Sequence, residues 1–273
     1  MTASAPNGSA ILSTLDKGLR VLEMLARPEA AEGLTLTELA NRLGMHRTTL
    51  FRFLATLRAR GYVEREAATD RYRLGIGVLT MASSLLHNLD VRRIARPILL
   101  DLRNSTQELV HLAVMNEDGV VTVDRFEGQR ALSLQTEVGS RRPAYCTAAG
   151  KAILAYLPAA RVAAILADGM PEVTPRTITT PEAMHRQLVE IRRLGYAVDN
   201  EERTDGVRCV AAAVFGHEGE PVAAISLAAP TMRFPAERVA VVGEEVAVAA
   251  VTISRRLGFS VREVTHQGGM AAS

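Results

Sequence analysis

Apolar residues recur every three or four positions near the start of the chain, a spacing typical of amphipathic helices. The first predicted helix begins at Ser13, which has capping-box spacing to Asp16. Its apolar positions are Leu15, Leu19, Leu22 and Ala26. A second, short helix follows, with Thr35 and Glu38 as a further capping box and Gly44 as a left-handed C-cap. The pattern therefore predicts two helices separated by a turn.

A third predicted helix has one apolar face and one polar, basic face. Its apolar positions are Leu50, Phe53, Leu54 and Leu57. Away from this face, in the first turns, lie His46, Arg47, Thr48, Thr49 and Arg52. A short helix, a tight turn and a longer helix with a polar N-terminal half match the helix-turn-helix plan, in which the second helix enters the major groove of DNA. Hydroxyl and guanidinium groups at these positions can contact phosphates or base edges.

Two β-rich segments, residues 62–66 and 71–74, predict a hairpin after the third helix. In the second segment Tyr72 shares a face with Leu74, and Arg71 shares the other face with Arg73. This order of elements predicts a winged helix-turn-helix over residues 11–75. The predicted DNA contacts are Thr35, His46, Arg47, Thr48, Thr49, Arg52, Arg71 and Arg73.

Charge supports the same interpretation. The whole chain carries a net charge of only +2, but residues 41–75 hold eight arginines against three acidic residues. A local cationic patch is typical of a protein that binds a polyanion, because neutralised phosphates release counterions. Charge alone is more typical of a solvated surface, so it adds weight only together with the predicted fold.

Residues 76–89 predict a linker helix. The apolar positions Val78, Ala82, Leu85 and Leu89 step by four, three and four, the spacing of a coiled-coil seam. So short a helix is marginal in water and needs a partner surface, either its own domain or a second subunit. We favour the second subunit, because winged-helix dimers must hold two recognition helices about one turn of DNA apart.

Residues 90–259 predict an α+β domain. Strand hairpins are expected at 109–114 with 120–125, and at 209–215 with 222–228. Helical patterns cover 90–104, 147–157, 159–167, 181–194 and 236–257. Hairpins at both ends with helices between them indicate a mostly antiparallel sheet covered by helices. The polar tail, residues 260–273, is predicted to be disordered.

Composition excludes several classes of protein. The 273 residues, 48% of them hydrophobic, suit two domains with separate cores. Two cysteines form neither a disulfide framework nor a metal-binding spacing, and no export signal or membrane span is evident, so a cytoplasmic location is expected. Phosphate-loop, serine-hydrolase and zinc-peptidase motifs are missing. We therefore predict no catalytic residue, metal, cofactor or membrane partner, and a protein that is not an enzyme.

Several segments closely resemble IclR-type bacterial transcription regulators. In the N-terminal part they are Ser13–Leu25, Leu34–Gly44, Arg47–Leu57, Gly61–Arg65 and Tyr72–Gly75; in the C-terminal part they are Val138–Leu157 and Gly195–Pro230. Most members carry Lys-Ser where Arg47-Thr48 stand here, a chemically similar pair. The resemblance implies a GAF-like, six-stranded domain that binds a small effector, usually a carboxylic acid or an aromatic compound. By position, it assigns the effector pocket to Leu134, Arg142, Ala148, Ala149, Asp199, Cys209, Ala211, Ser226 and Ala228.

Some of these positions also make physical sense by themselves. Arg142 precedes a proline on a predicted loop, where its guanidinium could hold a carboxylate with two hydrogen bonds, although an exposed loop arginine is more typically just solvated. Ala148 and Ala228, where several relatives have Gly or Ser, predict a larger or more apolar ligand. Cys209 is equally typical of a buried apolar position. Asp199 is equally typical of a solvated loop acid.

The sequence thus predicts a DNA-binding transcription regulator, a homodimer or tetramer, whose operator binding is controlled by a small-molecule effector. Such an effector must bind one arrangement of the subunits better than another, and the linker helix is the predicted transmitter. The alternative is a small-molecule sensor or enzyme whose N-terminal module makes only protein contacts.

Overall fold

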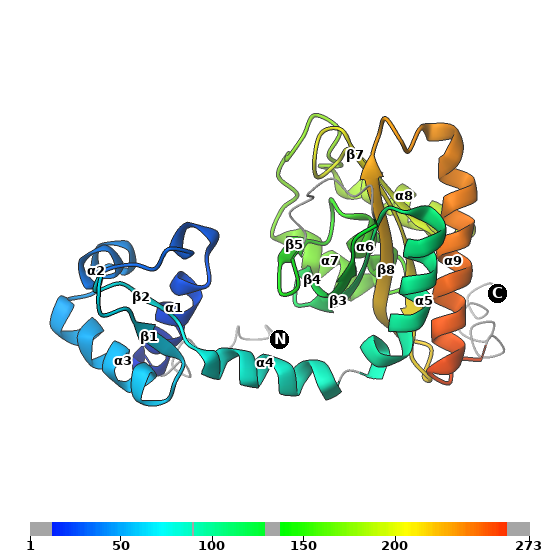
Figure 1. The fold of residues 1–273 in the computed structure, drawn as a ribbon. Helices are drawn as coiled ribbons and strands as arrows, with labels where there is room; N and C mark the ends of the chain where they lie inside the picture. The colour runs from blue at the N-terminus through cyan, green and yellow to red at the C-terminus, as the bar shows by residue number, and fades with distance from the viewer. Residues whose placement is uncertain (1–12, 89, 129–136, 261–273) are drawn as a thin grey trace, which may run out of the picture. The chain divides into compact units, whose positions relative to one another are not determined.

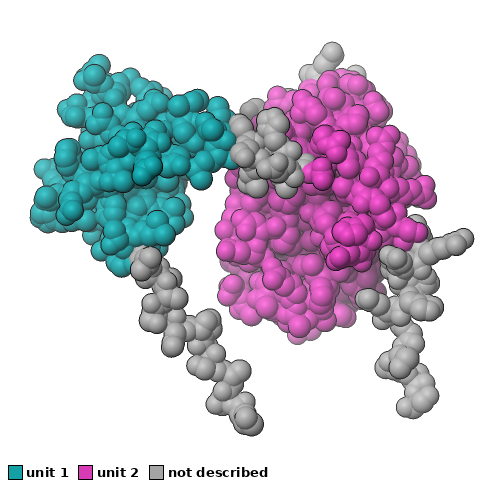
Figure 2. Space-filling view, turned by 90° about the horizontal axis from the view of Figure 1, so that it is seen from below, with its two compact units in different colours: residues 1–88 teal, residues 89–273 magenta. Residues whose placement is uncertain are grey.

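The structure is a computed structural model that describes residues 13–88, 90–128 and 137–260. It divides into two compact units, Met1–Asn88 and Leu89–Ser273, each of which is described by itself (Figure 2). Residues 261–273 of the predicted tail, and the predicted seam residue Leu89, lie outside the described residues.

The first unit is a winged helix-turn-helix followed by a helix (Figure 1). Its elements are α1 (Ser13–Leu25), the 3-10 helix η1 (Pro28–Ala30), α2 (Leu36–Leu43), α3 (Arg47–Ala59), β1 (Val63–Arg65), β2 (Tyr72–Leu74) and α4 (Ile76–Asn88). The predicted capping box at α2 is present: the Thr35 amide donates to Glu38 Oε2 at 2.7 Å, and the Glu38 amide donates to Thr35 Oγ1 at 3.3 Å. Gly44 ends α2 in the left-handed region with φ 63°. The predicted winged helix-turn-helix is confirmed.

The predicted apolar face of α1 is only partly right. Leu22 packs against the core, but Leu15, Leu19 and Ala26 are exposed, and the buried residues of this helix are Val21, Met24 and Leu25. The α1 sequence carries apolar residues on more than one side, so spacing identifies a helix without showing which side meets the core.

The second unit is a six-stranded antiparallel sheet with helices on both faces. Its elements are α5 (Asp90–Thr106), β3 (Leu109–Asn116), β4 (Gly119–Phe126), β5 (Arg141–Pro143), α6 (Ala148–Leu154), α7 (Ala159–Ala167), α8 (Pro181–Leu194), β6 (Ala197–Asn200), β7 (Val207–Phe215), β8 (Pro221–Pro230), η2 (Ala236–Arg238) and α9 (Val239–Arg256). The strand order is β5-β4-β3-β8-β7-β6. Helices α5 and α9 cover one face, and α6 packs on the other (Figure 1). The predicted α+β class is confirmed.

The two edge strands correct the sequence analysis. Residues 141–143 were expected on a loop, but they form β5, which pairs with β4 from Gly119 to Val121. The other edge strand, β6, was not anticipated at all. Strands of three and four residues are too short to show alternation, so only their pairing partners reveal them.

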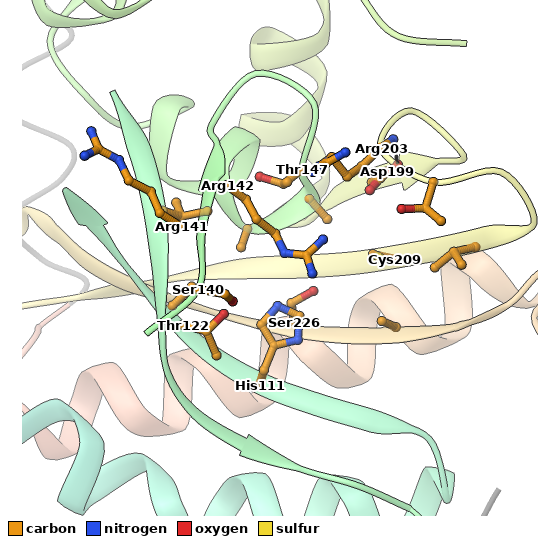
Figure 3. A pocket seen from close by; sticks show the side chains of 17 residues that line it. His111, Thr122, Ser140, Arg141, Arg142, Thr147, Asp199, Arg203, Cys209 and Ser226 are labelled. Atoms are coloured by element: carbon orange, nitrogen blue, oxygen red, sulfur yellow. Dashed lines mark hydrogen bonds between the residues drawn. The ribbon is translucent and has the colours of Figure 1, made fainter. Parts of the chain in front are cut away.

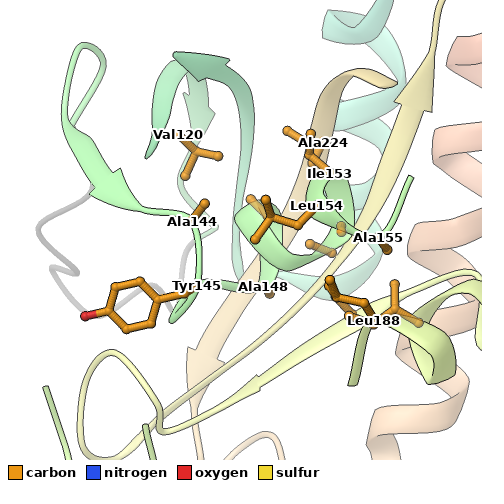
Figure 4. Close-up of a cluster of buried hydrophobic side chains, with 14 of the residues drawn as sticks. Val120, Ala144, Tyr145, Ala148, Ile153, Leu154, Ala155, Leu188 and Ala224 are labelled. Atoms are coloured by element: carbon orange, nitrogen blue, oxygen red, sulfur yellow. The ribbon is translucent and has the colours of Figure 1, made fainter. Parts of the chain in front are cut away.

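Helix α6 is the centre of the second core, and every one of its residues is buried (Figure 4). Gly150 allows a very close approach, because a Cβ at this position would lie 2.2 Å from the backbone oxygen of Ala144. Small residues on α6 face small residues of β7 and β8, such as Ala211 and Ala224. The close packing places the N-terminus of α6 over the sheet, beside the cavity described below. Among the described helices, none combines the length and the apolar character needed to cross a bilayer.

Candidate functional site

The N-terminal half of α3 presents polar and basic side chains to solvent. All five predicted residues, His46 to Thr49 and Arg52, are exposed. His46 is the N-cap residue, and its Nδ1 lies 3.1 Å from Thr48 Oγ1. Arg47 donates a hydrogen bond to Thr37 of α2. The buried face of the same helix, Leu50 and Leu54, fixes this orientation.

The remaining predicted DNA contacts have partners within the unit. Arg71 Nη1 donates to the Gly33 carbonyl at 2.7 Å and lies 3.4 Å from Glu38 Oε2. Arg73 forms an ion pair of 2.7 Å with Glu66, and Thr35 makes the capping box of α2. These three side chains therefore also stabilise the wing and the start of α2.

One residue of the recognition helix was missed. Phe51 is 53% exposed and lies three residues after Thr48 and one before Arg52. An exposed phenyl ring on this helix can contact a thymine methyl group in the major groove. The sequence pattern concealed it, because aromatic residues in helices normally indicate core positions.

In the second unit, a cavity of about 550 Å³ lies between the sheet, including its edge strand β5, and the N-terminus of α6 (Figure 3). It is lined by His111, Ala113, Val120, Thr122, Ser140, Arg141, Arg142, Thr147, Ala148, Ala149, Asp199, Arg203, Thr204, Val207, Cys209, Ser226 and Ala228. Seven of the nine predicted effector residues are in this set: Arg142, Ala148, Ala149, Asp199, Cys209, Ser226 and Ala228. The fold thus brings together residues that lie up to 86 positions apart, from Arg142 to Ala228.

Two predicted pocket residues are not among the described lining. Ala211 shares a strand face with Cys209, but it is fully buried in the core cluster that includes α6, and it is not among the residues that line this cavity. Leu134 lies outside the described residues.

The two arginines of β5 point in opposite directions, as strand geometry requires. Arg141 points outward, donating to Glu117 Oε2 at 2.9 Å and also to Asp118. Arg142 points into the cavity, and its guanidinium lies above the sheet (Figure 3). Burial, followed by the positive charge of Arg203, lowers the pKa of Arg142. A carboxylate between the two guanidinium groups would relieve this repulsion.

Arg203 was missed by the sequence analysis. It follows β6, it is half-buried, and within the described part of the chain it forms no ion pair. The nearby carboxylate of Asp199 is engaged with the backbone instead: its Oδ1 accepts from the Glu202 amide at 2.7 Å and from the Arg203 amide at 3.3 Å. The acidic residues before Arg203 suggested a solvated loop, and only the fold turns it toward Arg142.

Asp199 lies near the buried ion pair of Lys151 and Glu202. Lys151 of α6 has no exposed surface, and its Nζ donates to the Val198 carbonyl at 2.6 Å and to Glu202. Burial raises the pKa of Asp199 to about 6, although the charge of Lys151 opposes the shift. The expectation of a solvated loop acid is wrong, because Asp199 is only 4% exposed.

The sheet side of the cavity carries further polar residues that were not predicted: His111, Thr122 and Ser140. His111 lies opposite Ser226 in the register of β3 and β8. Burial, with the charges of Arg142 and Arg125, lowers the pKa of His111 to about 4, so its imidazole is neutral at physiological pH. Strand alternation alone could not show which face of β3 meets a ligand cavity.

Burial disfavours the thiolate form of both cysteines. Burial raises the pKa of Cys146 to about 11 and that of Cys209 well above its ordinary value, so both thiols stay protonated. Over the described ranges, no cluster of three or more His, Cys, Asp or Glu side chains could hold a metal ion.

An exposed basic recognition helix, a wing, and a separate domain with a partly open polar cavity define a class of protein: a DNA-binding regulator that responds to a small molecule. Comparison with known families agrees. Residues 14–67 match the IclR helix-turn-helix domain, and residues 83–255 match the bacterial transcriptional regulator IclR C-terminal domain.

Individual relatives support the same conclusion. The chain is 34% identical to the HTH-type transcriptional regulator KdgR of Escherichia coli over 243 residues, which cover 88% of this chain and 92% of the relative. The Thermotoga maritima IclR crystal structure has a TM-score of 0.74 at 31% identity, covering 91% of this chain and all of that one. An IclR homologue from Microbacterium hydrocarbonoxydans, solved with 4-hydroxybenzoate, has a TM-score of 0.79 at 26% identity, covering 90% of this chain and 99% of that one.

This chain belongs to the IclR family of bacterial transcription regulators. It is a DNA-binding regulator with a C-terminal effector-binding domain, as predicted. The N-terminal match does not support the alternative of a module that makes only protein contacts.

Proposed function

We propose that this regulator binds operator DNA through α3 and its wing, and that an organic acid in the cavity controls the binding. We assign DNA binding to residues 11–75, transmission to 76–89 and effector binding to 90–259. The observation that carries the proposal is the convergence of Arg142 and Arg203 on one cavity.

The charge of the cavity favours an anion. Arg142 and Arg203 contribute two positive charges, and Asp199 contributes one negative charge when ionised. Arg141 is neutralised outside by Glu117 and Asp118. The net positive charge is matched by a carboxylate, which accepts paired hydrogen bonds from a guanidinium.

The effector proposal is tested by comparing organic acids with their methyl esters in thermal unfolding of the full chain. A ligand that prefers the native state raises the melting temperature by mass action. We expect acids to stabilise the protein more than their esters, and Arg203→Gln to abolish the difference. Arg193→Gln is the matched control, because Arg193 is exposed on α8 and pairs with Glu190. Equal stabilisation by acid and ester would overturn the proposal.

The DNA proposal is tested by mobility shift with the DNA upstream of the gene. We expect Arg47→Ala and Arg52→Ala each to weaken binding, and to lower the slope of log affinity against log salt by about 0.9 if one phosphate contact is lost. Arg20→Ala removes an exposed arginine from α1 and serves as the charge-matched control. Unchanged affinity in both recognition-helix variants would contradict the assignment.

We propose a homodimer, or a tetramer built from it, with α4 as part of the seam. Ile76, Leu79 and Met81 of α4 are 67%, 59% and 62% exposed. Of the predicted seam residues, Val78 and Ala82 are half-buried. A helix with such exposed apolar residues is stabilised by a second subunit. Sedimentation of wild type and Leu79→Glu tests this: the variant should have a lower mass, and equal masses would count against the seam.

We further propose that the chain acts by binding alone, as expected of a regulator, and that it works in the cytoplasm where the chromosome lies. Protonated thiols at both cysteines support the absence of thiol catalysis. Turnover of any acid that stabilises the protein, followed by product analysis, would contradict this.

A further inference from the structure

Three buried polar atoms of the cavity lack a hydrogen-bond partner among the described residues: His111 Nδ1, Ser140 Oγ and Arg203 Nε. Buried polar atoms are normally paired, because an unpaired one loses its hydration without compensation. Three such atoms in one cavity indicate an occupant that bears hydrogen-bonding groups at several points. An apolar ligand body would leave His111 and Ser140 unsatisfied.

The described lining of the cavity includes no phenyl, phenol or indole side chain; its flat groups are the imidazole of His111 and the guanidinium groups of its arginines. Hydroxyl groups are instead contributed by Thr122, Ser140, Thr147, Thr204 and Ser226. Ala148 and Ala228 predicted a larger or more apolar ligand. The lining around them is polar, and it favours a more polar ligand instead.

The polar groups fall into two sets. Arg203 and Asp199 lie on the side of the β6 loop, whereas His111 and Ser140 lie on the opposite side of the Arg142 guanidinium, toward the sheet (Figure 3). Ser140 is held there by its backbone, since its carbonyl accepts the Thr122 amide at 3.1 Å. A ligand that reaches both sets needs polar groups at two separated points.

The two sets differ in charge. The set on the β6 side is cationic through Arg142 and Arg203, whereas His111 is a neutral imidazole because its pKa is about 4. A neutral imidazole presents one donor and one acceptor nitrogen, which suits a hydroxyl or a carbonyl group. One carboxylate therefore fits the cationic set, and uncharged oxygens fit the sheet side.

We propose that the effector is a non-aromatic monocarboxylic acid carrying hydroxyl or keto oxygens along its chain, and that His111 and Ser140 select it. The carboxylate lies between Arg142 and Arg203, and an oxygen further along the chain bonds to His111 Nδ1 and Ser140 Oγ. The cavity of about 550 Å³ is within the range of small-molecule sites, so an acid of five or six carbons fits inside it. This inference rests on the proposed organic-acid site.

The test measures affinities of the full-length chain by calorimetry for four classes of probe. These are five- and six-carbon aldonic and keto acids, hexanoate as the chain without hydroxyls, 4-hydroxybenzoate as an aromatic acid, and glucose as a polyol without a carboxylate. We expect at least one aldonic or keto acid to bind tenfold or more tightly than hexanoate, 4-hydroxybenzoate and glucose.

Variants then assign the selectivity to residues. His111→Leu and Ser140→Ala should each lower the affinity for the oxygenated acid by up to about tenfold, which is the effect of one lost hydrogen bond. Neither variant should change the affinity for hexanoate. His185→Leu, an exposed histidine on α8, is the matched control. Ser140→Ala keeps the test decisive if the histidine variant misfolds, since it removes only one oxygen.

The outcomes separate the two proposals. If 4-hydroxybenzoate or hexanoate binds as tightly as every oxygenated acid, and Arg203→Gln abolishes that binding, the inference fails and the organic-acid site stands. If no acid of any class binds, both fail. If an oxygenated acid binds tightly but neither variant weakens it, the roles of His111 and Ser140 are refuted.

Discussion

Replacing Asp199 by asparagine isolates the cost of an ionised carboxylate beside the cavity. Burial raises the pKa of Asp199 from its ordinary 3.8 to about 6. Asparagine keeps an Oδ1 that accepts the amides of Glu202 and Arg203, but it removes the charge. The variant therefore changes the electrostatics of the site while it preserves the hydrogen bonds of this turn.

The raised pKa of Asp199 makes the stability of the folded protein depend on pH. Because the folded-state pKa lies above the unfolded one, the native protein binds more protons between about pH 4 and 6, and the wild type loses stability as pH rises through this window. The pKa shift corresponds to a loss of roughly 3 kcal/mol in the free energy of unfolding. This loss is complete above about pH 6 and absent well below about pH 4. Lys151 and Glu202 also face Asp199, and their own ion pair remains in the variant.

Urea unfolding of wild type and Asp199→Asn between pH 4 and 8 measures this difference. We expect the variant to gain little stability at pH 4 and up to about 3 kcal/mol at pH 7 to 8. Affinity for an organic acid should fall above pH 6 in the wild type and stay flat in the variant, because the opposing carboxylate is gone. A stability difference that does not depend on pH, or a loss of stability at pH 8, would refute the reasoning.

Three further substitutions test other parts of the structure. Thr35→Ala removes the capping box of α2 and should lower the stability of the first unit by about 1 kcal/mol, measured by urea unfolding. Gly150→Ala places a Cβ 2.2 Å from a backbone oxygen and should destabilise the second unit by more than about 3 kcal/mol, whereas Gly18→Ala, which meets only an ordinary contact at 3.8 Å in helix α1, should be neutral or stabilising. Lys151→Met leaves Glu202 buried without its cation and should lower the stability by about 3 to 5 kcal/mol, with much of the loss recovered in the double variant Lys151→Met, Glu202→Leu. Failure of the double variant to recover would show that the charge pair is not the cause.

The N-terminal unit was predictable because its signals are local. Capping residues, a C-cap glycine and apolar spacing act within a few residues, so the helix-turn-helix and the wing followed from short stretches of sequence. Exposure of the α3 side chains also followed, since a helix that buries Leu50 and Leu54 must turn Thr48 and Arg52 outward. The buried face of α1 did not follow, because apolar residues lie on more than one side of that helix.

The cavity depended on contacts between distant segments. Resemblance to a family supplied positions such as Arg142 and Cys209, but it named neither Arg203 nor His111, whose side chains reach the cavity only through the pairing of β3 with β8 and the turn after β6. Residue types and local spacing thus determined the helices, the wing and the basic surface. Which charges meet inside the second unit was decided by the tertiary structure, because burial and long-range strand pairing, not neighbours along the chain, set the surroundings of each side chain.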